Sequence, residues 1–151
     1  MSRSLAALRT APAAVLVLGF GGLLPFVLLA LFAAFRPEHG YAYFIATLAQ
    51  YAAVICSFVG ALQWAYAVRD DARGGEAWLR YGFSVIPGLG GWLALQTPVW
   101  TALRLQAALL VLCLAVETRL PSKAHPPAWL APLRYALTLV AALSLAAASV
   151  A

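Results

Sequence analysis

Apolar residues run through this chain in long blocks with few polar interruptions, and this pattern predicts helices that cross a membrane. About 20 consecutive apolar residues in a helix span the roughly 30 Å hydrocarbon core of a bilayer. The blocks lie at residues 13–35, 42–68, 79–97, 99–118 and 132–150. We therefore expect an all-α integral membrane protein, in which residues 1–151 form a single membrane domain, a bundle of five transmembrane helices.

The boundary between the third and fourth predicted helices is the least marked. It rests on Gln96-Thr97-Pro98, the only candidate break in a long apolar stretch. Thr97 is a suitable N-cap, and Pro98 suits the first helical position because no backbone N–H is needed there. We expect a tight helical hairpin at this point, with Thr97 capping the fourth helix.

The first apolar block is too long for a cleaved signal peptide, whose apolar region has about 7–15 residues. The sequence Ala33-Ala34-Phe35-Arg36 at its end is also a poor cleavage site. We expect a retained helix.

Basic residues gather on one side of the predicted topology. Eight of them fall in the N-terminal tail, after the second helix, or around the start of the fifth: Arg3, Arg9, Arg69, Arg73, Arg80, Arg119, Lys123 and Arg134. The loops on the other side contain only Arg36. Because loops rich in Lys and Arg stay in the cytoplasm, we expect a cytoplasmic N-terminus and a C-terminus outside.

Composition agrees with a membrane protein. The chain is 64% hydrophobic and 10% charged, whereas a soluble domain has about 25% charged residues. The net charge is +5. The basic residues lie beside apolar segments and are not interleaved with aromatic residues, so we expect no nucleic-acid partner. Cys56 and Cys113 fall inside apolar segments with no nearby Cys or His partner, and we expect small buried side chains.

The second predicted helix combines polar and small residues. Gln50, Ser57 and Trp64 repeat every seven residues and so share a helix face. Beside them run two ladders of small residues: Ala49, Ala53, Ser57, Ala61, Ala65, and Ala52, Cys56, Gly60. Such ladders let helix backbones approach closely in lipid. The helix is either a packing helix, or Gln50, Ser57, Gln63 and Trp64 line a polar pocket toward the bundle axis; Gln63 could also reach the headgroups.

The third predicted helix contains Pro87 followed by three glycines and Trp92, with Ser84 just before them. Proline removes a helical hydrogen bond and clashes with the preceding turn, so we expect a kink or local unwinding. Non-helical backbone in a membrane must face protein or a water-filled cavity, and broken helices often form transporter sites. Kinks without a transport role are common, and that is the other interpretation.

Arg104 is the one charged residue well inside a predicted span, and such residues are functional candidates. It lies about 9 Å from the start of its helix, so it can snorkel to the outer interface or make a structural hydrogen bond. Alternatively, Arg104 with Gln106 binds an anionic headgroup or a carbonyl of a lipophilic ligand. The absence of an acidic residue at that depth argues against a carboxylate-driven pump.

Enzyme signatures are missing from the sequence. His39 and His125 fall in loops on opposite sides of the predicted topology, so they cannot share a metal ion or a haem. No G-x-S-x-G, Walker or H-E-x-x-H motif occurs. We expect no enzymatic activity, no metal site and no cofactor.

Four apolar segments with characteristic Gly, Pro, Ser and Trp positions resemble, in matching order, domain-of-unknown-function family 3429. They are LGFGGLLPF (18–26), YAAVICSFVGALQWAYAV (51–68), YGFSVIPGLGGWLAL (81–95) and PAWLAPLRYALTL (127–139). Because the family contains bacterial inner-membrane proteins and mitochondrial relatives, the resemblance implies a multi-pass protein of a bacterial inner membrane with no established activity. Where a His is expected before the tryptophan of the second helix, this chain has Gln63, and any chemistry of that His would be absent.

These observations lead to two function hypotheses. The first is a non-enzymatic module that binds a lipid, a quinone-like ligand or a membrane-protein partner in a groove of the second to fourth helices, with a homo-oligomer left open. The residues expected to line that groove are Gln50, Ser57, Gln63, Trp64, Ser84, Pro87, Trp92 and Arg104. The second is a small transporter or channel gated at a helix break from Pro87 to Gly91.

Overall fold

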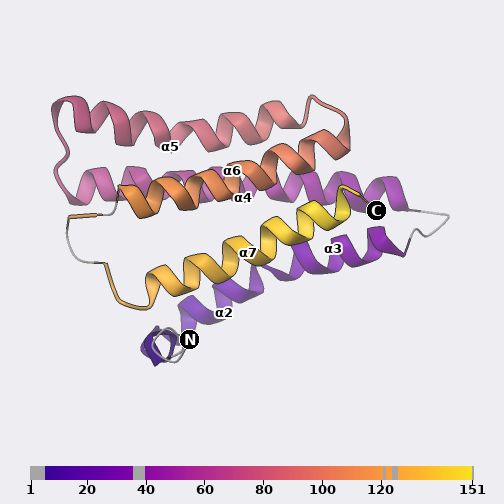
Figure 1. The fold of residues 1–151 in the computed structure, drawn as a ribbon, viewed down its shortest axis with the longest axis horizontal. Coiled ribbons are helices and arrows are strands. Elements are labelled where there is room, and N and C mark those ends of the chain that lie inside the picture. Colours follow the sequence, from indigo (N-terminus) through magenta and orange to yellow (C-terminus); the bar gives the residue numbers. More distant parts are fainter. Residues whose placement is uncertain (1–5, 36–39, 121, 124–125, 151) are drawn as a thin grey trace.

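The chain folds into a bundle of helices that lie side by side (Figure 1). The computed structural model describes residues 6–35, 40–120, 122–123 and 126–150. Its main helices are α2 (Ala13–Gly21), α3 (Leu24–Ala34), α4 (Tyr41–Arg69), α5 (Gly74–Ala94), α6 (Val99–Arg119) and α7 (Leu130–Ala148). No strand occurs in these residues, which confirms the predicted all-α class.

Four segments are long and apolar enough to cross a membrane: Ala13–Ala34, which contains α2 and α3, and the helices α4, α6 and α7. Large apolar side chains point outward from them, among them Leu18, Phe58 and Leu139. Helix α5 has 21 residues, but its glycines, Pro87 and Arg80 lower its hydropathy. The structure therefore confirms a multi-helix membrane protein, while five crossings stay a prediction.

The first predicted span is divided into two helices. Helix α2 ends at Gly21 and α3 begins at Leu24, with Pro25 in its first turn. The hydroxyl group of Tyr51 on α4 donates a hydrogen bond to the Gly22 carbonyl oxygen at 2.8 Å. No residue of α2 is buried, so this short helix is the least covered part of the bundle.

A kink or a local unwinding was predicted at Pro87; helix α5 is continuous through this residue, so the local unwinding from Pro87 to Gly91 is wrong. Helix α5 also packs closely against α4. A Cβ atom added at Gly60 would lie 2.7 Å from the Ser84 carbonyl oxygen and 3.0 Å from the Pro87 ring, and one at Gly91 would lie 3.2 Å from the Ala53 backbone. Close contact with α5 is thus made by Cys56 and Gly60 of one small-residue ladder on α4 and by Ala53 of the other.

The hairpin between α5 and α6 forms as predicted, but the role assigned to Thr97 is wrong. Its hydroxyl group donates to the Ala94 carbonyl oxygen at 2.7 Å and so closes the last turn of α5. Pro98 comes immediately before α6, which begins at Val99.

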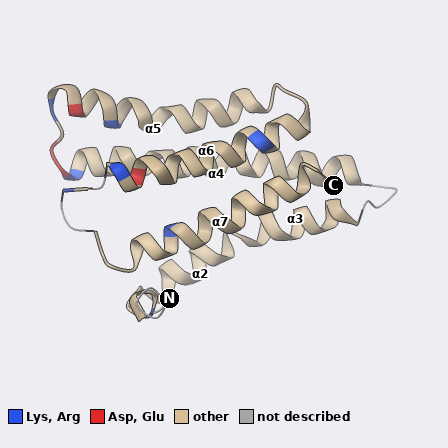
Figure 2. Cartoon of the chain, viewed as in Figure 1, with Lys and Arg blue, Asp and Glu red and all other residues tan. Residues whose placement is uncertain are grey.

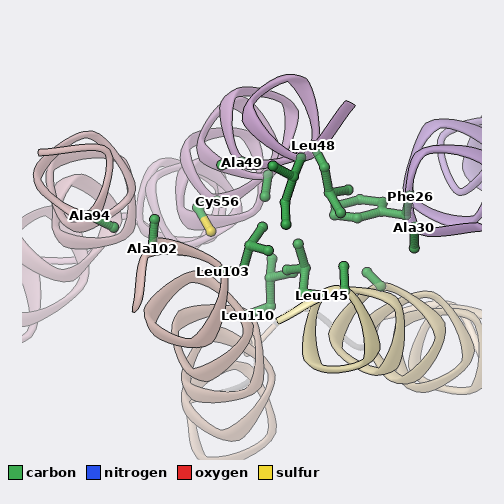
Figure 3. Close-up of a cluster of buried hydrophobic side chains, with 14 of the residues drawn as sticks. Phe26, Ala30, Leu48, Ala49, Cys56, Ala94, Ala102, Leu103, Leu110 and Leu145 are labelled. Carbon is green, nitrogen blue, oxygen red and sulfur yellow. The ribbon is translucent and has the colours of Figure 1, made fainter. Parts of the chain in front are cut away.

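The hydrophobic core lies between α3, α4, α6 and α7. Phe26, Leu48, Leu103 and Leu145 are almost fully buried, and Figure 3 shows them meeting between these helices. Cys56 and Cys113 are buried and unpaired, as expected.

Charged side chains gather at one end of the bundle, whereas the opposite end has few (Figure 2). That charged end comprises the link between α4 and α5, the end of α6 and the start of α7. The start of α2 and the end of α7 lie toward opposite ends of the bundle (Figure 1).

Candidate functional site

The eight predicted site residues do not meet in one pocket. Ser57, Trp64 and Ser84 line a shallow groove of about 350 Å³ between α4 and α5. Trp64 packs edge-on against the Tyr81 ring at 4.8 Å, and the Ser84 hydroxyl donates to the Tyr81 carbonyl oxygen at 2.6 Å. Pro87 is buried against α4. This groove is open to lipid and offers few free polar groups.

The predicted orientation toward the bundle axis is wrong for most of the polar face of α4. Gln50, Ser57 and Trp64 are all exposed on the outside of the bundle, and so is Trp92 on α5. Only Gln63 is buried, at 3% exposure. Its amide nitrogen lies 3.5 Å from the Leu120 carbonyl oxygen, while its Oε1 has no partner among the described residues.

Arg104 makes a structural hydrogen bond, one of the two interpretations given for it. Its Nη2 donates to the Ser149 carbonyl oxygen at 3.1 Å and its Nε to the Ser149 hydroxyl at 3.4 Å. A cation at this place complements the partial negative charge at the end of α7. Gln106 is fully buried and lies apart from Arg104; its Nε2 donates to the Ala49 carbonyl oxygen at 2.9 Å.

The charged end contains a cluster that fixes the connector after α6, which we call the connector clamp. Its members are Asp70, Glu76, Arg80, Ser122 and Lys123. The buried Arg80 guanidinium lies 3.0 Å from the Glu76 carboxylate and 3.8 Å from that of Asp70. Asp70 accepts hydrogen bonds from the Ser122 hydroxyl at 2.6 Å and the Lys123 backbone N–H at 2.8 Å. This clamp is structural.

A second ionic cluster lies between α4, α6 and α7. The Nε atom of Arg134 is 2.9 Å from Oε2 of Glu117, and the two side chains are 10% and 13% exposed. The Tyr66 hydroxyl donates to Glu117 Oε1 at 3.3 Å. Arg134 Nη2 is buried and has no hydrogen-bond partner within the described part of the chain. We call these three residues the Arg134 site.

Two cavities meet at Arg134. One, of about 290 Å³, is partly polar and lies among the ends of α4, α6 and α7, where Tyr66, Glu117 and Ser122 line it. The other, of about 140 Å³, is almost wholly apolar and extends toward α2 and α3, where Gly19 and Phe26 line it. Arg134 lines both cavities, so this side chain lies between a polar and an apolar space.

Sequence reasoning missed the Arg134 site because each member had an ordinary local explanation. Arg134 was counted with the basic loops, and Glu117 was placed at the inner end of a helix. One available signal was that both charges lie just inside the ends of apolar blocks, on the two sides of one short connector. Opposite charges so placed can pair across antiparallel helices.

The described residues contain no group of three or more His, Cys, Asp or Glu that could hold a metal ion. The expectation for His39 and His125 falls outside the described residues.

Comparison with known proteins gives a family and no activity. The family described as "Protein of unknown function (DUF3429)" matches residues 11–150. Transmembrane protein 69 of Xenopus tropicalis is 33% identical over 146 residues, covering 92% of this chain and 54% of that relative. The chain thus spans about half the length of this curated relative. No solved structure matches the chain. The family match and this identity confirm the resemblance of the four apolar segments, and the chain belongs to the DUF3429 family of proteins of unknown function.

Proposed function

We propose that this chain is a five-span protein of a bacterial inner membrane that binds a lipophilic molecule without transforming it, at the Arg134 site. Residues 1–151 would form one membrane domain, with the charged end in the cytoplasm. The location rests on the resemblance to inner-membrane proteins. Membrane lipids are the expected surroundings, and a membrane-protein partner or a homo-oligomer is compatible with the same bundle.

Two observations support α5 as the fifth span. At 21 residues it is about 31 Å long, which matches a hydrocarbon core of roughly 30 Å. Its buried charge, Arg80, lies in the connector clamp beside Glu76 and Asp70 rather than in lipid. With five crossings, the basic links after α4 and α6 also share one side.

The topology can be tested with a reporter enzyme that is active only outside the cytoplasm, fused to the C-terminus. Five crossings predict an active fusion. An inactive C-terminal fusion, together with an inactive fusion in the link at residues 95–98, would show that α5 stays on the cytoplasmic side.

The observation that carries the binding proposal is the buried Arg134 Nη2 with no partner among the described residues. A buried donor without an acceptor is costly, and native proteins satisfy most such groups. The two cavities that Arg134 lines supply space for a ligand that offers an acceptor. A ligand acceptor in that position would satisfy this donor.

The shallow α4–α5 groove supports binding less well, because its Ser84 hydroxyl is already bonded within its own helix. The alternative of a gate at the Pro87–Gly91 segment loses its premise, since α5 is helical throughout that segment.

The binding proposal is tested by mass spectrometry of molecules that co-purify with the protein. The site is changed in the paired variant Glu117→Gln with Arg134→Gln, which removes both charges together and so leaves no unpaired charge in the bundle. Arg104→Gln is the matched control, because it removes another arginine that lines neither cavity. We expect a lipophilic species with the wild-type chain and the control and its loss from the paired variant. Equal recovery from all three would overturn the proposal.

A further inference from the structure

The chemistry of the Arg134 site narrows the class of ligand, an inference that rests on the proposed binding function. We infer that the ligand is an uncharged amphiphile. Its carbonyl oxygen accepts a hydrogen bond from Arg134 Nη2, and its apolar chain lies in the cavity beside α2 and α3. The argument uses the charge balance of the site, the shape of the two cavities and the position of α2.

Charge balance favours an uncharged headgroup. Arg134 and Glu117 already neutralise each other at 2.9 Å, and no other charged side chain lines the two cavities among the described residues. An anionic ligand would bring a second negative charge next to the Glu117 carboxylate in a place of low dielectric, where like charges repel strongly. A carbonyl oxygen supplies the missing acceptor and adds no charge.

The Glu117 carboxylate needs no further donor from a ligand. Its Oε2 pairs with Arg134 Nε and its Oε1 accepts from the Tyr66 hydroxyl. The unmet requirement in this cluster is therefore an acceptor for Nη2. A headgroup that only donates, such as an ammonium ion, would leave that requirement unmet and would lie beside the guanidinium.

The apolar cavity has the character of a chain-binding space. Its volume of about 140 Å³ is close to that of an engineered apolar cavity of about 150 Å³ that stays dry and binds benzene. Gly19, Gly22 and Phe26 form one side, and Ile55 and Leu137 belong to the helices facing them. A short length of hydrocarbon chain can occupy such a space, with the remainder in the surrounding lipid.

Helix α2 leaves this cavity accessible from the bilayer. Phe26 on α3 is buried in the core, whereas α2 has no buried residue. The two helices are divided at Gly22 and Leu23, and every residue of α2 is at least partly exposed. A molecule dissolved in the bilayer can therefore reach Arg134 without passing through water.

Two kinds of membrane molecule share this chemistry, a quinone and a neutral glyceride ester. Four probes separate them from other amphiphiles: a benzoquinone with a ten-carbon chain, dioctanoylglycerol, ionised decanoate, and decanol, which lacks a carbonyl. Each is titrated into the detergent-solubilised protein at pH 7.5, and binding is followed by the change in thermal unfolding temperature. We expect at least one of the two carbonyl probes to bind about tenfold more tightly than decanoate or decanol, as one charge-assisted hydrogen bond allows.

Two pairs of variants locate the binding. Arg134→Lys keeps the charge but removes the Nη2 donor. It should lower the affinity for the carbonyl probe about tenfold, whereas Arg104→Lys should leave that affinity unchanged. Gly19→Leu places a side chain toward Leu137 and Leu133, whereas Gly21→Leu on the same helix faces open space. We expect Gly19→Leu to abolish chain binding and Gly21→Leu to leave it unchanged.

The outcomes separate this inference from the proposed function. If decanoate binds more tightly than both carbonyl probes, and Arg134→Lys abolishes that binding, the proposed binding function stands. The inference that the ligand is uncharged is then overturned. Binding of every probe unaffected by Arg134→Lys and Gly19→Leu would overturn the inference and the assigned site together. Binding of none of the four probes, with no lipophilic molecule co-purifying, would overturn the proposed function itself. Preference for the quinone over the glyceride, or the reverse, identifies the source of the carbonyl.

Discussion

The α4–α5 contact and the Arg134 site both lie within the bundle, but they differ in how their parts are brought together. The first is made by residues spaced regularly along two helices that follow each other in the chain, such as Gly60 and Gly91. The second joins Tyr66, Glu117 and Arg134, which come from three different helices. Packing by small residues tolerates no added volume, whereas the ionic site tolerates no unpaired charge.

The largest effect should come from unpairing the ionic site. Arg134→Gln leaves the Glu117 carboxylate buried without its partner, and we expect a loss of about 3–5 kcal/mol in unfolding free energy. Adding Glu117→Gln removes the stranded charge and should restore most of that loss. Unfolding in a denaturing detergent, followed by circular dichroism, measures both. A double variant as unstable as the single one would contradict this account of the pair.

Added volume at the α4–α5 contact should have the next largest effect. Gly60→Val places a side chain against the Ser84 carbonyl oxygen, because even a Cβ there would be only 2.7 Å away. We expect a loss of about 2–3 kcal/mol, as for overpacked cores, measured by the same unfolding experiment. Gly82→Val is the control on α5, since a Cβ at Gly82 meets nothing within 4 Å. Equal losses in the two variants would show that the low helix propensity of valine, and not the contact with α5, causes the loss of stability.

Arg104 provides a smaller test, because it lies near the other end of the bundle and lines neither cavity at Arg134. Arg104→Gln removes the guanidinium from the Ser149 carbonyl oxygen, and we expect a loss of about 1 kcal/mol. Hydrogen exchange should quicken in the last turn of α7 and nowhere else. Faster exchange near Glu117 would instead show that Arg104 is coupled to the Arg134 site.

The same contrast explains how much of this protein the sequence could predict. Helix existence follows from local apolar content, so α4, α6 and α7 appear within two residues of their predicted ends. The small-residue ladders were equally local, and Gly60 of one ladder packs closely against α5. The direction that a polar face takes is not local. Gln50 and Trp64 share the predicted face, yet that face points outward because α5, α3 and α6 cover the other sides of α4.

The ionic clusters could not be predicted from local sequence patterns either, because their members come from distant segments. Asp70 and Asp71 are neighbours in one polar link, yet the Asp70 side chain is fully buried in the connector clamp while the Asp71 side chain is exposed. Only the fold of the connector after α6 brings Ser122 and Lys123 against Asp70. Contacts between segments about 50 residues apart leave no periodic trace in the sequence.

The smallest expected effect concerns the exposed rim of that clamp. A hydrogen bond from Lys123, at 2.6 Å, is the main cause that lowers the pKa of the Glu76 carboxyl group, with Arg80 contributing. Since the folded pKa lies below the unfolded value of about 4.3, this contact stabilises the clamp above that pH and is lost as pH falls through the folded pKa. The protection factor of the Lys123 amide, which donates to Asp70, should therefore decline below about pH 4. Glu76→Gln should reproduce that decline at neutral pH and leave the Arg134 site unaffected. An amide equally protected in the variant would show that Asp70 alone holds the connector.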